Sequence, residues 1–278
     1  MKKRFYSPWI SLLIALAMLG GGNALAGGLV ELDFDAANFP GSPVIDNEYW
    51  PMVPGTVYTY FAETEDGCEW NIVDVTNLEY VVAAGVNTVV VLDIEWLDES
   101  DDCADIAYTF PVGDITEFTF DWYAQDIAPD DGGNIWYMGE DTYSFDYDSD
   151  DCEDEVFVGD PFNTDACQDG SFEAGTPGAV EGIAEAGIVM LAKPEKGDFY
   201  QQELDVENAE DWGKVLNFVP VEDKEDCLKT KEWTPLEPGA VEHKYYCPGG
   251  TPYDGLVLIE EVSGGRKIWV ELIDVFNY

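Results

Sequence analysis

The segment Asp121-Trp-Tyr-Ala-Gln-Asp126, followed by Gly133-Asn-Ile-Trp-Tyr137, predicts a β-hairpin. Successive residues of a strand point to opposite faces, so Trp122 and Tyr123 lie on different sides of the first arm. The connection contains Asp131-Gly-Gly-Asn134, which is typical of a turn. Aromatic residues on both arms favour a packing role for the hairpin, and a binding face for a polymer or a small molecule is the alternative.

Apolar and polar residues alternate over many other short stretches, which is the pattern of β-strands. Strands are predicted at 28–35, 57–61, 70–76, 88–96, 115–125, 134–138, 199–204, 215–219, 241–246, 256–262 and 267–276. Such closely spaced strands predict an all-β fold, an antiparallel meander forming a curled half-barrel or a sandwich, with long acidic loops and little helix. Short helices are expected only at 206–212 and 179–186.

The first 26 residues have the pattern of a secretory signal peptide. Basic residues at 2–4 precede an apolar run over 9–19, and Ala24-Leu-Ala26 fits a cleavage site. No later stretch reaches the roughly 18 apolar residues of a membrane-spanning helix. We therefore expect the mature chain to have no transmembrane segment and to be extracellular or at the cell surface, with the periplasm as the alternative.

The remaining chain shows no internal repeat and no long linker. We expect residues 27–45 to form an N-terminal strand and linker, and residues 46–278 to form a single β-rich domain with an acidic insert over 141–173. The segment 28–35 is a terminal strand followed by the Pro- and Gly-containing stretch 39–43. Such a strand can complete the sheet of a neighbouring subunit, which would make a homopolymer by donor-strand pairing. Pairing with the chain's own sheet is the alternative.

The chain carries 12 lysines and arginines against 58 aspartates and glutamates, a net charge of −46. Residues 27–192 contain 39 of these acids and no lysine, arginine or histidine. Repulsion among the carboxylates must be relieved by water, by screening ions, by bound metal or by the basic residues from Lys193 onward. Nucleic acid and anionic lipid surfaces are not expected as partners, because both are negatively charged.

Six cysteines in an exported chain predict three disulfides rather than thiol chemistry. Closing a short loop costs less chain entropy than closing a long one. Sequence proximity therefore favours the pairs Cys68–Cys103, Cys152–Cys167 and Cys227–Cys247, with the other pairings left open.

The acidic insert is the strongest candidate for a metal site. From Asp141 to Glu173 it holds 12 acidic residues and no basic one. Alternating carboxylates let a loop direct several oxygens at one hard cation, and calcium takes about six to eight of them. The pattern is not an EF-hand, because Asp151 and Phe157 stand at the positions of the turn glycine and the bidentate glutamate. The candidate calcium ligands are Asp146, Asp148, Asp150, Asp151, Asp154, Asp160, Asn163, Asp165 and Asp169.

A disulfide between Cys152 and Cys167 would tie these acids into one compact loop, loosely similar to the calcium-and-cystine loops of thrombospondin type 3 repeats. The alternative for the insert is a solvated acidic face adapted to saline surroundings.

Catalytic signals are few. His243 is the only histidine, which excludes HExxH motifs and sites with several histidines, and neither GxSxG nor GxxxxGK[ST] occurs. A paired-carboxylate glycosidase stays open, although so many acids give that pattern little specificity. Nine tryptophans and 15 tyrosines offer platforms for sugar rings, with core packing as the alternative. The sequence favours a protein that is not an enzyme.

Four ordered motifs resemble a group of uncharacterised exported bacterial proteins. They are Asp121 to Asp126, Gly133 to Tyr137 with Gly139-Glu-Asp141, Thr230-Lys-Glu-Trp-Thr-Pro-Leu-Glu-Pro238, and Glu242-His-Lys-Tyr-Tyr246. The opening Asp46-Asn-Glu-Tyr-Trp-Pro-Met-Val-Pro-Gly55 is also similar. The resemblance implies a common β-rich fold and no particular activity. Two features depart from the group's pattern, namely Cys247 in place of a small residue and a longer acidic stretch before Gly170.

The leading hypothesis is therefore an exported, acidic, disulfide-stabilised calcium-binding protein with a structural or binding role at the cell surface or in the extracellular matrix, possessing an N-terminal strand suited to self-assembly. The alternative is a glycan-binding or carboxylate-based glycan-cleaving protein, with a matrix polysaccharide as its partner.

Overall fold

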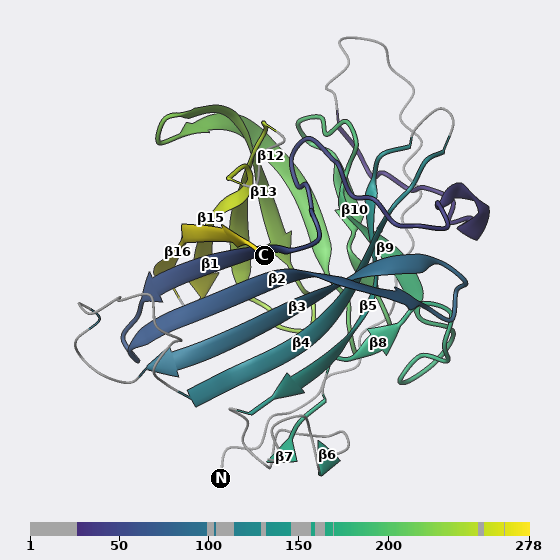
Figure 1. The fold of residues 1–278 in the computed structure, drawn as a ribbon, viewed down its shortest axis with the longest axis horizontal. Helices are drawn as coiled ribbons and strands as arrows, with labels where there is room; N and C mark the ends of the chain where they lie inside the picture. The colour runs from purple at the N-terminus through teal and green to yellow at the C-terminus, as the bar shows by residue number, and fades with distance from the viewer. Residues whose placement is uncertain are drawn as a thin grey trace.

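A computed structural model describes residues 27–98, 103, 114–128, 132–145, 157–158, 165–168, 170–249, 253–263 and 265–278. Within these residues the protein is nearly all β (Figure 1). One antiparallel sheet of 14 strands curls into a nearly closed barrel, which confirms the curled sheet and not the sandwich. The helical structure in the described residues is one 3-10 turn, Ala36–Asn38, and no helix there is long and apolar enough to cross a membrane.

The strands are β1 (Thr56–Glu63), β2 (Cys68–Val81), β3 (Asn87–Asp98), β4 (Asp114–Gln125), β5 (Ile135–Ser144), β6 (Phe157–Val158), β7 (Asp165–Ala166), β8 (Phe172–Glu173), β9 (Glu185–Met190), β10 (Phe199–Gln201), β11 (Glu203–Leu204), β12 (Trp212–Val221), β13 (Lys224–Trp233), β14 (Val241–Cys247), β15 (Gly255–Ser263) and β16 (Arg266–Asn277). Their order in the sheet is β10-β12-β13-β14-β15-β16-β1-β2-β3-β4-β5-β9-β11, and β8 pairs with β5. The short strands β6 and β7 pair only with each other.

The two edges of the sheet meet because β10 and β11 are consecutive in the chain. Only Gln202 separates them, and its backbone N–H donates to the carbonyl oxygen of Asp211 at 2.7 Å. Strand β10 continues the pairing of β12, whereas β11 pairs with β9 at the opposite edge. A single short segment therefore closes the curl.

Two glycines make this closure sterically feasible. A Cβ atom at Gly187 on β9 would lie 2.2 Å from the carbonyl oxygen of Gln202, and one at Gly213 on β12 would lie 2.6 Å from the ring of Tyr200. Any larger residue would force the edges apart, because cores do not absorb overlaps of this size without backbone shifts.

The segment between residues 45 and 52 covers one end of the curl and completes the apolar core there. Ile45 and Met52 are almost fully buried, and the N–H of Met52 donates to the carbonyl of Ile45 at 3.1 Å. The amide of Asn47 donates to the carbonyls of Gly133 and Leu191, at 3.0 and 3.2 Å. This segment therefore fastens the N-terminal part of the domain to the β4–β5 turn and to the end of β9.

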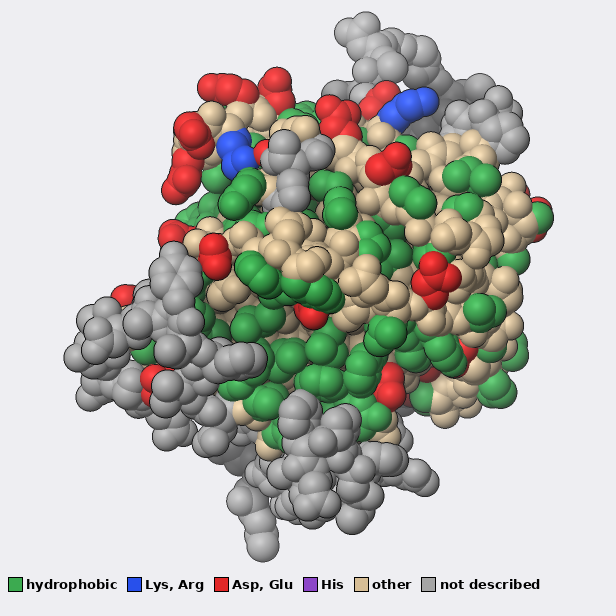
Figure 2. All heavy atoms as spheres, in the orientation of Figure 1, with side chains coloured by type: hydrophobic (Ala, Val, Ile, Leu, Met, Phe, Trp, Pro, Cys, Tyr) green, Lys and Arg blue, Asp and Glu red, His purple; other side chains and the backbone are tan. Residues whose placement is uncertain are grey.

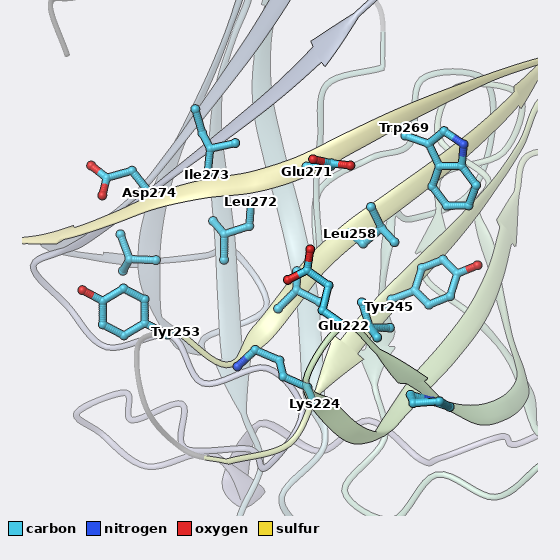
Figure 3. Close-up of a pocket in the computed structure, with 14 residues that line it drawn as sticks. Glu222, Lys224, Tyr245, Tyr253, Leu258, Trp269, Glu271, Leu272, Ile273 and Asp274 are labelled. Atoms are coloured by element: carbon cyan, nitrogen blue, oxygen red, sulfur yellow. The ribbon is translucent and has the colours of Figure 1, made fainter. Parts of the chain in front are cut away.

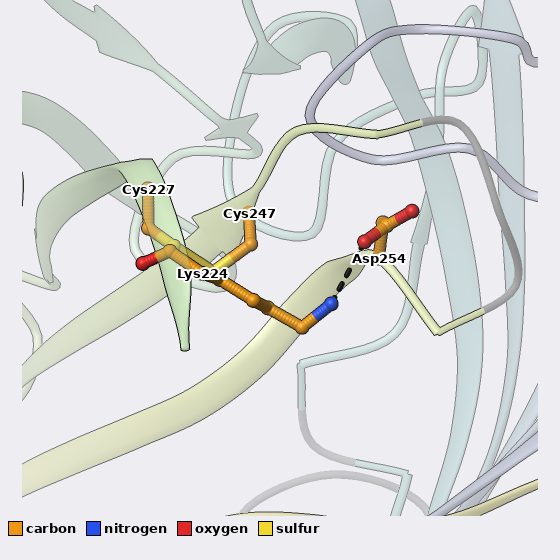
Figure 4. The surroundings of a disulfide bond; sticks show 4 residues. All are labelled: Lys224, Cys227, Cys247 and Asp254. Carbon is orange, nitrogen blue, oxygen red and sulfur yellow. Dashed lines mark hydrogen bonds and ion pairs between the residues drawn. A yellow bond between two sulfur atoms is a disulfide. The ribbon is translucent and has the colours of Figure 1, made fainter. Parts of the chain in front are cut away.

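Two disulfides of the expected set are present. Cys68 at the start of β2 bonds to Cys103, and Cys227 on β13 bonds to Cys247 on β14 (Figure 4). Beside the second bond, Lys224 forms an ion pair with Asp254 at 2.8 Å. Among the expected pairs, the one between Cys152 and Cys167 stays a prediction, because Cys152 lies outside the described residues.

Several predicted elements are wrong. The predicted strand 28–35 is reduced to one parallel bridge between Leu29 and Phe199 of the same chain, because the chain turns into the 3-10 helix that Asp35 caps. The helices expected at 179–186 and 206–212 are turns, with β9 and β12 beginning inside them. Strand β13 was not predicted, since its lysines and glutamates lack strong strand propensity and only pairing with β12 and β14 stabilises it.

We expect Gly187→Ala to destabilise the protein by roughly 1–3 kcal/mol, because the new methyl group overlaps backbone atoms at the closing edge. Urea unfolding followed by tryptophan fluorescence measures this loss. Gly41→Ala is the matched control, because a Cβ there meets no atom within 4 Å. Equal unfolding midpoints for the two variants would contradict this account of closure.

Candidate functional site

Strands β3 and β4 carry acidic residues on the inner face of the curl and apolar residues on the outer face. On β3 and β4, Asp93 and Asp121 line the interior. Their neighbours Leu92, Ile94, Phe118 and Phe120 pack on the other side with Tyr143 and Ala166. Figure 2 shows hydrophobic side chains gathered over this outer surface. The usual pattern, polar outside and apolar inside, is therefore reversed in this part of the sheet.

The acidic interior encloses a cavity of about 210 Å³, which we call the lumen. Five carboxylic acids, one lysine and four aromatic residues contribute to its wall. They are Asp93, Glu95, Asp121, Glu242, Glu261, Lys244, Trp50, Tyr58, Tyr60 and Tyr123. An adjoining space of about 370 Å³ shares Asn71, Glu95 and Glu261 with the lumen and continues to Asp66 and Glu69. Glu95 and Asp66 are exposed, so the lumen is open to solvent on this side.

Lys244 is the cation of the lumen. Its ammonium lies 3.1 Å from the carboxylate of Glu232 and 3.1 Å from that of Glu242. Glu232 also accepts hydrogen bonds from the hydroxyls of Thr230, at 2.8 Å, and Tyr246, at 3.3 Å. Burial alone would lower the pKa of Lys244, but the two carboxylates raise it well above its ordinary value. The lysine therefore stays charged, and it also opposes the rise in the pKa of Asp93 and Asp121 on the opposite wall.

On the opposite wall the acids are held by neutral donors. The amide of Asn71 donates to Asp93 at 2.5 Å. The hydroxyl of Tyr137 lies 2.5 Å from Asp121 and 2.9 Å from Glu140, and it bridges the two carboxyl groups. One hydroxyl hydrogen cannot satisfy two carboxylates, so this pair is suited to share a proton.

Burial and mutual repulsion raise the pKa values of the inner acids. Burial raises the pKa of Asp93 and of Asp121 well above the usual range, and Asp121 and Glu140 respectively raise them further. Burial also raises the pKa of Glu140 to about 7 and that of Glu261 to about 7, the latter helped by Glu242. Near neutral pH the lumen thus holds carboxyl groups that either bind protons or are stabilised in their ionised form by another cation.

Aromatic rings complete the lumen wall. The Trp50 ring lies 5.5 Å from the ring of Tyr123 and 5.5 Å from that of Tyr246, and Tyr123 stacks on Tyr137 at 4.9 Å. The negative faces of such rings attract organic cations within about 6 Å. The lumen therefore combines carboxylates with aromatic rings, and both kinds of group attract ammonium ions.

Of the nine predicted calcium ligands, the structure describes one. Asp146, Asp148, Asp150, Asp151, Asp154, Asp160, Asn163 and Asp169 are outside the described residues, and Asp165 belongs to the short strand β7. In the described part of the chain, no three aspartates, glutamates, cysteines or histidines are arranged to hold a metal ion. The calcium site thus stays a prediction.

His243 faces away from the lumen, on the outer side of β14. Its Nδ1 lies 3.2 Å from Glu260, a carboxylate that also pairs with Lys229 at 3.4 Å and with Lys267. Burial lowers the pKa of His243, and Lys229 lowers it further. The only histidine therefore belongs to a surface ion-pair network.

The sequence analysis did not predict the lumen. Asp121 and Lys244 line the cavity, where Lys244 pairs with Glu232 and the hydroxyl of Tyr137 joins Asp121 to Glu140. Alternation alone did not reveal this, because a period of two does not say which face is inward.

Comparison with protein-family models, with curated proteins and with solved structures found no match to this chain.

We expect the protein to be more stable at pH 5 than at pH 8. A carboxyl group whose pKa is higher in the folded state stabilises the fold below its unfolded value, and this contribution is lost as the pH rises through the folded value. For Glu140 and Glu261 the loss falls between the ordinary value of 4.5 and the folded value of about 7. Melting temperatures from pH 5 to pH 8 test the sign.

The variants Glu140→Gln and Glu261→Gln distinguish the contribution of the inner acids to the pH dependence of stability from that of repulsion among surface acids. Each should remove part of the pH dependence, on the order of 2 kcal/mol between the two pH values. Glu181→Gln, at an exposed turn, is the control and should leave the slope unchanged. A pH slope that is the same in all three variants would refute the assignment.

Proposed function

We propose that this protein is an exported, disulfide-stabilised binding protein that takes a small organic cation, such as a diamine or polyamine, into its acidic lumen. The observation that carries the proposal is the composition of the cavity wall, five carboxylic acids and four aromatic rings with Lys244 as its single lysine. The Cys68–Cys103 and Cys227–Cys247 disulfides support an oxidising compartment.

Charge and solvation favour such a ligand. Ionised carboxylates that face one another inside a protein repel, and a bound cation replaces the protons that would otherwise neutralise them. Lys244 already demonstrates the arrangement, because its ammonium bridges Glu232 and Glu242. A flexible diamine could extend from Asp93 and Glu95 toward Glu261 in the same way.

An organic cation suits the lumen better than a metal ion does. Calcium demands about six to eight oxygens close together, and the described residues offer no such cluster. Tyr58, Tyr60 and Trp50 instead present apolar surface beside the acids. Ammonium groups on a methylene chain satisfy both kinds of surface, since rings pack against methylenes and attract cations.

Calorimetry with 1,4-diaminobutane and spermidine at about 0.15 M salt tests the proposal, because this salt screens exposed charges more than enclosed ones. We expect saturable binding with one site per chain, and tighter binding at pH 8 than at pH 5 because the raised pKa of Glu261, about 7, lies between these two pH values. Repeating the titration in two buffers of different ionisation enthalpy should show proton release near pH 7.

Neutral 1,4-butanediol, with the same carbon chain, is the control ligand and should not bind. Asp93→Asn and Glu95→Gln should each weaken diamine binding by about tenfold or more, the loss of one favourable ionic contact. Glu79→Gln, on the exposed end of β2, controls for the acidic exterior. Equal affinity in the lumen variants and in Glu79→Gln would overturn the proposal.

The acidic insert supports calcium binding as a second candidate function. Ser144 and Cys167 exchange two backbone hydrogen bonds of 2.9 Å, and the amide of Gln168 donates to Asp141 at 2.8 Å. The residues between them carry most of the predicted ligands, and the fold fastens both ends of this segment to the edge of β5. A cation shared by carboxylates in a closed loop would relieve their repulsion.

If the insert binds calcium, EDTA should lower the melting temperature by several degrees in low-salt buffer, and added calcium should restore it. The combined variant Asp148→Asn, Asp150→Asn and Asp154→Asn should lose the calcium response while keeping the diamine response of the lumen. An unchanged melting temperature after chelation would rule out the calcium site.

A further inference from the structure

A groove runs over the outer face of β14, β15 and β16, on the other side of the wall that bounds the lumen (Figure 3). Side chains alternate along these strands. Lys244 and Ile259 line the lumen, whereas their neighbours Tyr245 and Leu258 line the groove. The end of the β12–β13 hairpin, with Glu222 and Lys224, forms the facing edge. The groove has a volume of about 550 Å³, within the usual range of ligand pockets.

Aromatic residues stand at both ends of the groove. Trp269 and Tyr245 lie at one end and Tyr253 at the other (Figure 3). Trp269 is 45% exposed and Tyr253 is 60% exposed, so both offer ring faces that the fold does not use. Leu258 and Ile273 supply an apolar floor between them. Exposed rings above an apolar floor match the flat C–H faces of sugar rings.

Acidic residues lie between the aromatic ends. Glu222 and Glu271 are exposed, and Asp274 lies near Tyr253 (Figure 3). Carboxylates accept hydrogen bonds from hydroxyl groups and are among the stronger acceptors a protein offers. The one lysine of the groove, Lys224, is already paired with Asp254 at 2.8 Å. The groove therefore presents acceptors for hydroxyls and repels anions.

We propose that this outer groove binds a short neutral oligosaccharide. Its rings stack on Trp269 and Tyr253, and its hydroxyls donate to Glu222 and Glu271. The negative charge of the groove selects against uronic and sulfated sugars, since like charges meeting in a binding site cost affinity. This site is separate from the lumen, so its occupancy does not depend on the proposed cation binding.

Titration of the full mature chain with neutral oligosaccharides of several linkages, followed by tryptophan fluorescence and calorimetry, tests the inference. We expect saturable binding of at least one neutral series and no binding of matched uronic or sulfated oligomers. Trp269→Ala and Tyr253→Ala should each weaken binding by about tenfold or more, the loss expected for a stacking ring. Tyr278→Ala, an exposed aromatic outside the groove, should bind as the unaltered chain does.

Glu222→Gln keeps the test valid if an aromatic variant fails to fold, because Glu222 is exposed at a hairpin turn. It should weaken neutral-sugar binding and reduce the discrimination against uronic sugars. Asp93→Asn in the lumen should leave sugar binding unchanged. Three results would each overturn the inference: no neutral series binds, the groove variants bind as tightly as Tyr278→Ala, or an aliphatic probe binds the groove while sugars do not.

Discussion

The arrangement of this protein depends on carboxyl groups that face one another across a curled sheet with few cations among them. Lys244 pairs with Glu232 and Glu242, whereas Asp93, Asp121 and Glu140 on the opposite wall accept hydrogen bonds from the neutral donors Asn71 and Tyr137. Repulsion of this kind has to be met by protons, water or a ligand. The fold keeps the acids together because apolar contacts elsewhere in the core outweigh that cost.

The closed end of the curl shows where the compensating stability resides. Ile45 and Met52 pack with β-strand residues such as Val75, Val89 and Val91 in one continuous apolar cluster. Two disulfides fasten neighbouring strands or loops, and the consecutive strands β10 and β11 join the edges of the sheet. An exposed edge is a liability in β proteins, and this closure removes most of it. The rest of the fold therefore stabilises a lumen whose carboxyl groups repel one another.

The wall formed by β14, β15 and β16 has a different chemistry on each face. Its inner face contributes Lys244, Glu242 and Glu261 to the lumen, and its outer face contributes Tyr245 and Trp269 to the groove. Two residues adjacent in sequence thus belong to two separate sites. Successive side chains of each strand point to opposite faces of this wall. A ligand in one site can therefore affect the other site only by shifting the backbone of the strands. The two proposed ligands differ in charge, which keeps the sites distinct.

The sequence by itself determined the class of fold and the shortage of cations, and it favoured the two disulfides that the structure contains. Strands such as β3, β4 and β16 were predicted close to their bounds, since alternation and turn residues are local signals. It did not reveal β13, whose charged residues form a strand only because β12 and β14 flank it. Nor did it place Asp93, Asp121 or Glu140 on the inner face, because alternation separates the two faces of a strand without showing which face points inward. Only the closure of the sheet decided which side is enclosed, and with it which carboxyl groups lose their water.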